Sequence, residues 1–497
     1  MKSELLDGPK DTEEDKELKN ILNEKQHKTV KQTTYLVIPF ALQTDYVSAL
    51  EKLCASTYTK RSGQKAKLWK EKKFSRQRLF AHISNLIDRK ASEKNESIGT
   101  RLVLEESAKP SFGLPNNRNI NLIFTPDKEN FNFSIGNVEL YLFETQVGFV
   151  VFDILYKEHE NINNIILSNY YLKKIYQYKD NLRFLKKTGR DQQVEVNVSL
   201  YSLVEAFLSE VQVETYFEDV KQHPSHAIVY SSALLESDFR KEKNYNKQLL
   251  NYLFQMRKSF KDTYDAPPSE YEIDGHNEII QLFENSFWGV SLEGAAHIAY
   301  LKDNEADIFF KDTHTKNVRE VYFYLYILAL HQHYTLQYFS TLVSRLPANL
   351  DDYLETKKNS RKSVENLRSR MVFFTLRCAF KQVSHISHQT SLYEMFRRAL
   401  RIEELMDELH LEIEALSSIT EIEETRKSKK IQNIILYVTT FFILISTTND
   451  SMGITTFIDT SHWPSNKLIT PWVAGAMWTL IAGGSFYLII QLLIRRK

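Results

Sequence analysis

Two uncharged segments lie near the end of the 497-residue sequence, and they constrain the fold more than any other feature. Residues 431–448 read IQNIILYVTTFFILISTT, and residues 468–494 read LITPWVAGAMWTLIAGGSFYLIIQLLI. At the rise of an α-helix the first segment spans roughly 27 Å, which matches a bilayer core. The sequence therefore predicts two transmembrane helices. The alternative is a pair of buried core helices, which the basic flanks of both segments disfavour.

Basic residues flank the two segments on the sides away from the loop that connects them. They are Arg426, Lys427, Lys429 and Lys430 before the first segment, and Arg495, Arg496 and Lys497 after the second. The connecting loop at 449–467 carries one lysine and two aspartates. Because positively charged flanks stay in the cytoplasm, both termini are expected inside, including the basic tail at 495–497, and the loop outside.

The composition indicates that the large N-terminal part lies in a reducing compartment. The two cysteines, Cys54 and Cys378, are too few for a disulfide framework. A formal net charge of +1 gives no global field for nucleic acid, so direct nucleic-acid binding is not expected. Residues 1–32 lack the apolar core of a signal peptide and are expected to form a flexible, solvated tail.

Residues 33–312 are predicted to form a mixed α/β (α+β) cytoplasmic domain, because strand and helix patterns follow each other without a regular βαβ rhythm. Strand patterns occur at 34–40, 121–125, 138–145, 147–156, 226–235 and 287–301. The runs at 138–145 and 147–156 predict a hairpin, and 287–301 predicts a strand pair turned at Glu293 and Gly294. Helices are expected at 199–211 and, in a basic stretch, at roughly 65–90.

A helical stalk region is predicted at 313–430. No glycine or proline occurs between Pro347 and Gly453, so a long stretch lacks helix breakers. An apolar stripe consists of Ile402, Leu405, Leu409, Ile413, Leu416 and Ile419. Because the stripe runs toward 431–448, one long helix is expected to start near Ser391 and to include the first span. The alternative is a separate soluble hairpin, with a break at Ser417 and Ser418.

Polar residues within the first span share one face of the predicted helix. Asn433, Tyr437, Thr440, Leu444, Thr447 and Ser451 are spaced three or four residues apart. Such a face should point to protein or water rather than to lipid. Around a symmetry axis it would line a pore, with Leu444 as a hydrophobic constriction. The pattern fits equally well an alternative without a pore, in which the hydroxyl groups form hydrogen bonds between neighbouring helices.

The layout of the chain resembles that of CorA-type divalent-cation channels, from about residue 315 to 497 and more loosely in the N-terminal domain. The resemblance implies a homo-oligomer in the lipid bilayer, usually a pentamer, whose first transmembrane helix lines the pore. The Gly-Met-Asn signature of the family is missing. The matching outer mouth reads Asn449, Asp450, Ser451, Met452 and Gly453, and this departure weighs against magnesium selectivity.

CorA-like proteins without that signature include membrane effectors associated with type III CRISPR systems, and this chain is most similar to those in overall plan. The resemblance implies an antiviral channel in the bacterial inner membrane. A small nucleotide messenger, such as S-adenosylmethionine-AMP, would gate it, and it would act by membrane permeabilisation. Mg²⁺ or another divalent cation is also implied as a ligand or permeant ion. The alternatives are a divalent-cation transporter and a membrane-anchored binding protein without a pore.

Other candidate chemistry has a simpler structural explanation. His331 and His333 are two residues apart and cannot share a helix face. Cys378, His385 and His388 have a suggestive spacing, but zinc would need a further ligand, so a structural role is favoured. The acidic residues at 403–404, 407–408 and 421–424 are most simply the solvated face of the stalk. In the CorA family, carboxylates between subunits bind regulatory magnesium. The spacing supports no catalytic arrangement, so the chain is not expected to be an enzyme.

Overall fold

The computed structural model describes residues 27–60, 62–74, 79–87, 97–115, 122–124, 126, 129–174, 182–187, 193–214, 226–241, 243–261, 268–275, 278–346 and 357–457. The chain divides into two units, Met1–Ile413 and Glu414–Lys497, which are described separately. Most of the predicted tail at 1–32, part of the predicted loop, the whole second span at 468–494 and the tail at 495–497 lie outside the described residues.

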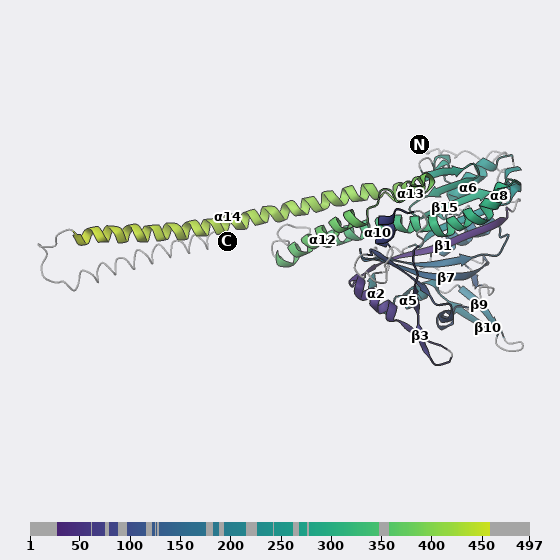
Figure 1. The fold of residues 1–497 in the computed structure, drawn as a ribbon, viewed down its shortest axis with the longest axis horizontal. Coiled ribbons are helices and arrows are strands. Elements are labelled where there is room, and N and C mark those ends of the chain that lie inside the picture. The colour runs from purple at the N-terminus through teal and green to yellow at the C-terminus, as the bar shows by residue number, and fades with distance from the viewer. Residues whose placement is uncertain are drawn as a thin grey trace, which may run out of the picture. The chain divides into compact units, whose positions relative to one another are not determined.

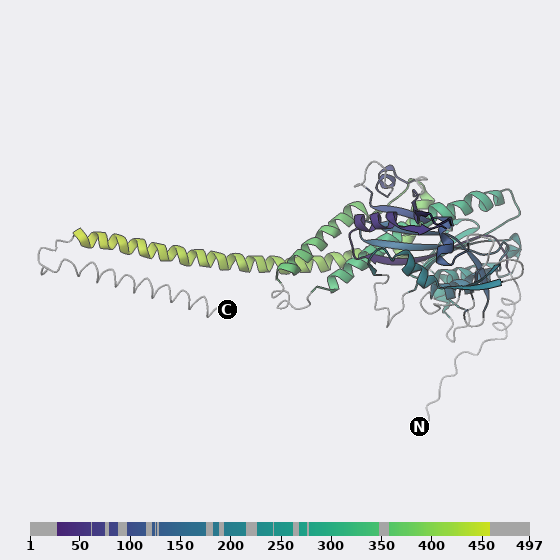
Figure 2. The same ribbon diagram turned by 90° about the horizontal axis from the view of Figure 1, so that it is seen from below.

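The first unit is built on one large, mainly antiparallel sheet. Its strands are β1 (Thr29–Leu42), β4 (Trp69–Glu71), β5 (Gly99–Leu104), β6 (Leu122–Phe124), β7 (Phe131–Phe143), β8 (Val147–Leu155), β9 (Leu182–Lys187), β10 (Gln193–Val198), β11 (Val213–Glu214), β12 (Ile228–Leu235), β13 (Ile279–Phe283), β14 (Ser286–Val290) and β15 (Gly294–Tyr300). The main path runs β10-β9-β6-β7-β8-β1-β12-β15-β14-β13, and Figures 1 and 2 show these strands side by side. Among the described strands, only β12 and β15 pair in parallel.

Strand β1 lies in the middle of this sheet, between β8 and β12, and both of its faces are covered. On one face, Tyr35 and Val37 pack in a core cluster with side chains of α10 (Phe323–Ser344), α12 (Lys357–Arg377) and α13 (Ser387–Ala399). On the other, Leu36 and Ile38 pack with side chains of α2 (Tyr46–Ala55), α4 (Ile162–Lys173) and α5 (Leu200–Phe207). A strand buried on both faces reads as a continuous apolar run, which explains the sequence TYLVIPFAL.

Smaller elements complete the first unit. They are α3 (Ala81–Ile87), α6 (Tyr245–Lys258), α7 (Glu270–Asp274), α8 (Ala306–Phe309), α9 (Thr315–Asn317), the 3₁₀ turns η1 (Glu106–Phe112) and η2 (Ser237–Lys241), the π-helical turns η4 (Phe310–His314) and η5 (Val318–Tyr322), and a hairpin of β2 (Thr57–Thr59) and β3 (Lys65–Lys67). Segments α8 to α10 follow each other without a gap. Hence helical structure extends almost unbroken from Ala306 to Ser344.

The predicted strands and the hairpin are confirmed. The runs at 138–145 and 147–156 form β7 and β8, which pair antiparallel, and 287–301 forms β14 and β15. The helix expected at roughly 65–90 is wrong for its first part, which forms β3 and β4, and only Ala81–Ile87 is helical among its described residues. In that first part Leu68 and Trp69 are buried, while the lysines of the two short strands are exposed. The lysines therefore belong to exposed strand positions and not to the polar face of a helix.

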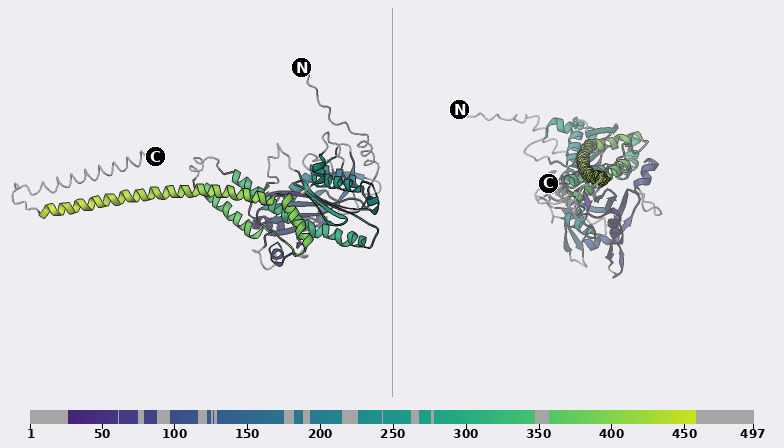
Figure 3. Two further views of the ribbon diagram at one scale, coloured as in Figure 1. Left: turned by 90° about the horizontal axis from the view of Figure 1, so that it is seen from above. Right: turned by 90° about the vertical axis from the view of Figure 1, so that its left-hand side faces the viewer.

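The long helix begins later than predicted. Arg401 has a φ of 52°, a left-handed conformation that interrupts the helix expected from Ser391 and separates α13 from α14 (Ile402–Phe457). Helix α14 is then continuous for 56 residues, through Ser417 and Ser418, so the alternative break there is absent. Figure 3 shows it as one unbroken coil.

Helix α14 also extends beyond the predicted end of the first span. It continues to Phe457, so Asn449–Gly453, expected as the start of a loop, is helical. Of the helices that the described residues form, none combines the length and the apolar character needed to cross a membrane.

Candidate functional site

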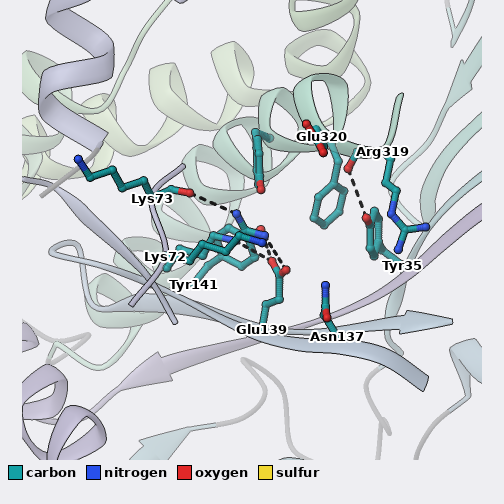
Figure 4. A pocket seen from close by; sticks show the side chains of 11 residues that line it. Tyr35, Lys72, Lys73, Asn137, Glu139, Tyr141, Arg319 and Glu320 are labelled. Atoms are coloured by element: carbon teal, nitrogen blue, oxygen red, sulfur yellow. Dashed lines mark hydrogen bonds and ion pairs between the residues drawn. The ribbon is translucent and has the colours of Figure 1, made fainter. Parts of the chain in front are cut away.

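A polar cavity of about 240 Å³ lies between the sheet and the start of α10. Its lining comes from β1, the segment after β4, β5, β7, η5 and α10: Tyr35, Lys72, Lys73, Arg101, Asn137, Glu139, Tyr141, Arg319, Glu320, Phe323 and Tyr324. Figure 4 shows these side chains gathered around the cavity. Residues more than 280 positions apart in sequence therefore meet at one site, which we call the basic cavity.

A buried ion pair forms one wall of the basic cavity. Arg101 donates from Nε to Glu139 Oε2 at 2.9 Å and from Nη2 to Oε1 at 2.6 Å, so the contact is bidentate. Arg101 Nη1 also donates to the carbonyl oxygen of Lys73 at 3.2 Å, and the Tyr141 hydroxyl donates to Glu139 at 2.7 Å. The Arg101 and Glu139 side chains are only 7% and 9% exposed. Three contacts thus fix the position of the Arg101 guanidinium, and Tyr141 helps to hold the carboxylate that pairs with it.

The opposite wall holds a second arginine. Arg319 pairs with the buried Asp153, and its guanidinium lies over the ring of Tyr35 at 5.8 Å. Tyr35 donates to the backbone carbonyl of Arg319 at 3.3 Å and packs on Phe323 with ring centroids 4.1 Å apart. Because the Arg319 side chain is 33% exposed, part of the guanidinium still faces solvent.

Burial keeps the charge states of this site fixed at neutral pH. Burial raises the pKa of Tyr35 well above its ordinary value, and the nearby carboxylates of Asp153 and Glu139 add to the shift. Burial lowers the pKa of Arg101, but Tyr141 and Glu139 raise it by more, so the net shift is upward. Burial also raises the pKa of Tyr324. The tyrosines are therefore neutral hydroxyl donors, and the arginines are permanent cations.

Charged groups of both signs meet at the basic cavity, where Glu139 pairs with Arg101 and Asp153 pairs with Arg319. The side chains of Lys72, Arg101 and Arg319 face Glu139 and Glu320 across the lining. Lys72 is exposed and its side chain lies on the cavity side, whereas the side chain of Lys73 points away (Figure 4). Oriented guanidinium groups and a mobile ammonium group are the groups that bind phosphate and carboxylate anions. The three cations are thus the groups of this cavity that could contact an anionic group.

The helix that forms one side of the basic cavity also reaches the start of α14. From α10, Gln332 donates to the carbonyl of Cys378 at 2.7 Å and accepts from Arg397 Nε at 3.3 Å. Arg397 in turn donates to Glu403 of α14 at 3.1 Å. His333 Nδ1 lies 2.8 Å from the carbonyl of Leu400. We call these contacts the α13–α14 junction; they connect α10 directly to the residues on either side of Arg401.

The predicted pore face lies entirely within α14. Asn433, Tyr437 and Thr440 are exposed, and the Thr440 hydroxyl donates to the carbonyl of Leu436 at 2.7 Å. For Leu444, Thr447 and Ser451, and for the outer-mouth residues Asn449, Asp450, Met452 and Gly453, the structure describes the helical backbone but not the side chains. Helical periodicity places the six predicted pore-face residues on one side.

The histidine and cysteine candidates are placed apart. His331 bonds with Thr145 at 2.8 Å and stacks on Phe143, while His333 bonds with Leu400, so both are structural core groups. Helix α12 ends at Arg377, so Cys378 does not share a helix with His388 of α13. Within the described residues, no group of three or more histidine, cysteine, aspartate or glutamate side chains could hold a metal ion.

Comparisons with known proteins found one solved structure of interest, the CorA magnesium transporter from Methanocaldococcus jannaschii. The match has 12% identity and covers 61% of this chain and 96% of the other, with a TM-score of 0.21. No protein-family profile and no curated protein matches the sequence. At this identity and TM-score, the likeness assigns neither a family nor a function.

Proposed function

We propose that the chain is one subunit of a homo-oligomeric membrane channel of CorA-like design, in which α14 lines the pore. The observation that carries the proposal is the surface of α14. Its large apolar side chains are exposed over several turns: Ile431, Ile434, Ile435, Leu436, Val438 and Ile443 are 46–62% exposed. A continuous exposed apolar surface of this kind needs lipid or another subunit to cover it.

The polar face of α14 fits the same proposal. A helix that lines a water-filled pore needs apolar side chains only where it contacts lipid or its neighbours. Asn433, Tyr437 and Thr440 supply a polar side, and the backbone hydrogen bond of Thr440 leaves its hydroxyl oxygen able to accept a further bond. The uncharged segment at 468–494 is proposed as the outer helix, which places both termini in the cytoplasm of a bacterial cell.

The finer proposal concerns the trigger. We infer that the channel is an antiviral effector of the type III CRISPR-associated kind, a pentamer that opens when the cytoplasmic domain binds a nucleotide messenger such as S-adenosylmethionine-AMP. The basic cavity supports this, because α10 contributes to the cavity and also contacts the α13–α14 junction. The chain is proposed to act by permeabilising the membrane and to have no catalytic activity.

Ion flux through liposomes tests the proposal. The purified full-length chain should form a higher oligomer and should release a trapped dye or potassium only when the messenger is added. Magnesium flux without messenger, strictly selective over monovalent ions, would instead favour a divalent-cation transporter. A monomer that leaves liposomes ion-tight under all conditions would favour a membrane-anchored binding protein without a pore.

A further inference from the structure

We propose that the basic cavity is the site at which this chain binds the phosphate group of a nucleotide. The inference rests on the proposed function, because it takes the sensed ligand to be a nucleotide, and it assigns the residues that would hold it. The site combines a cavity, three cationic side chains from separate segments and two buried carboxylates that orient the arginines.

The two arginines are prepared for an anion before any ligand arrives. Glu139 holds Arg101 through a bidentate pair, and Asp153, 3% exposed, holds Arg319. A guanidinium has five N–H donors, and the contacts that Arg101 makes with Glu139 and Lys73 use three of them. Because the two guanidinium groups are already held in place, phosphate binding costs less side-chain conformational entropy.

The remaining lining fits a sugar phosphate better than a bare ion. A volume of about 240 Å³ lies below the roughly 300–1,000 Å³ of sites for drug-sized ligands. The cavity would therefore hold a phosphate with its adjoining sugar, while a larger ligand would project outward. Asn137 offers an amide, and Tyr35 and Phe323 form an apolar wall. A divalent cation is disfavoured, because Glu139 already pairs with Arg101.

Glu320 is an acidic residue of the lining, so neutralising it should change the affinity for phosphate in the direction opposite to neutralising Lys72. It lies on η5 directly after Arg319 and lines the same cavity. A bound phosphate would be repelled by this carboxylate and attracted by the Lys72 ammonium. Neutralising Glu320 should therefore strengthen binding, whereas neutralising Lys72 should weaken it. Residues needed only for folding would not produce this pair of opposite effects.

The experiment uses the full-length chain in detergent, with AMP as the probe and adenosine as its uncharged counterpart, measured by titration calorimetry. AMP should bind at least roughly tenfold more tightly than adenosine, and Lys72→Gln should weaken AMP binding roughly tenfold. Lys73→Gln is the matched control, because that side chain is adjacent and points away from the cavity. It should change the affinity by less than about threefold. Glu320→Gln should strengthen binding by about threefold.

Equal binding of AMP and adenosine would overturn the site, as would equal losses in the Lys72 and Lys73 variants. Binding of Mg²⁺ from MgCl₂ without AMP, seen in the same calorimetry and abolished by Glu320→Gln, would also overturn the site, because it would identify a cation site. Flux measurements with the messenger separate this inference from the proposed function. AMP binding that depends on Lys72 while liposomes stay closed would support the site and reject the channel. If Lys72→Gln changes neither the messenger-driven flux nor the AMP affinity, the site is rejected.

Discussion

Arg101 and Glu139 form a buried ion pair. Replacing one of them should lower the free energy of unfolding far more than replacing both. Arg101→Leu leaves the Glu139 carboxylate buried without its cation, and breaking a buried pair in this way costs about 3–5 kcal/mol. We expect the Arg101→Leu variant to show a loss of this size in the free energy of unfolding, measured by urea denaturation of the detergent-solubilised chain.

The double variant Arg101→Leu with Glu139→Leu is the control for this prediction. It removes both charges, so no buried carboxylate remains unpaired and much of the stability should return. A double variant as unstable as Arg101→Leu alone would show that packing of the arginine stem, and not the ion pair, stabilises this wall of the basic cavity.

Two buried histidines of α10 should make the protein less stable in mild acid. Burial lowers the pKa of His331 to about 3 and that of His333 to about 4, from an ordinary value of 6.5. Their contribution to stability is complete above pH 6.5 and falls as the pH drops toward those lower values, because the unfolded chain takes up the protons first. At pH 5, His331 alone should cost about 2 kcal/mol relative to pH 7.5.

Thermal unfolding at pH 5.0 and 7.5 tests this expectation with the His331→Gln variant. Glutamine can keep the contact with Thr145 but does not titrate, so the pH dependence should become smaller by about the amount due to His331. His410→Gln, at an exposed position of α14, is the control and should keep the pH dependence of the wild type. An unchanged pH dependence in His331→Gln would contradict the prediction.

At the scale of elements, Arg397 connects three helices. It bonds to Gln332 of α10 and to Glu403 of α14, while it belongs to α13. Arg397→Met should keep the apolar stem but remove both contacts, and so loosen the first turn of α14. We expect hydrogen exchange at the amides following Arg401 to accelerate roughly tenfold, corresponding to about 1.4 kcal/mol of lost local protection. Mass spectrometry of peptides from this segment would measure it.

The adjacent Arg398, which is exposed, provides the matched substitution. Arg398→Met should leave exchange in the first turn of α14 within about twofold of the wild type, since surface substitutions rarely change stability by more than about 0.5 kcal/mol. Equal acceleration in both variants would show that the junction depends on the general charge of α13 and not on the contacts of Arg397.

The sequence predicted the strands better than the helix ends. Alternating or dense apolar residues marked β7, β8, β12 and β15 because each is buried on one or both faces. The start of α14 was misplaced because Arg401 adopts a left-handed conformation without the glycine that usually marks such a position. The basic stretch near Lys65 was misread because its lysines are exposed on short edge strands, where charge carries no helical period.

The basic cavity could not be predicted from the sequence. Its cations lie at positions 72, 101 and 319, far apart in the sequence, and no shared motif connects them. They meet only because β4 pairs with β5, which brings Lys72 beside Arg101, and because η5 packs beside β1. A signal was present in the aromatic run at 322–326, which is denser than a simple core helix requires, but a pattern on one helix does not identify its neighbours.

At the scale of the whole molecule, Leu444 should act as a gate if copies of α14 surround a pore. Leu444→Ser places a hydroxyl at the proposed hydrophobic constriction and should let water and ions pass without any ligand. Cells that express this variant should stop growing, and liposomes should leak without messenger. Thr440→Val, on the same face, should instead lower the conductance. The control is Ile445→Ser, one residue away, since helical periodicity places Ile445 outside the polar face. Equal leakage from both serine variants would contradict a gate at Leu444.

The central position of β1 has a consequence for biosynthesis. The ribosome makes this apolar strand first, yet its partner β12 ends at Leu235, about 190 residues later. At roughly 5–20 residues per second, β1 waits on the order of 10–40 s before one of its edges can pair. Both edges of the nascent strand TYLVIPFAL are unpaired until β8 has been made, about 110 residues after β1, and the edge that faces β12 stays unpaired for the whole interval. We therefore expect the newborn chain to depend on a chaperone that holds apolar segments, and to aggregate when synthesised without one.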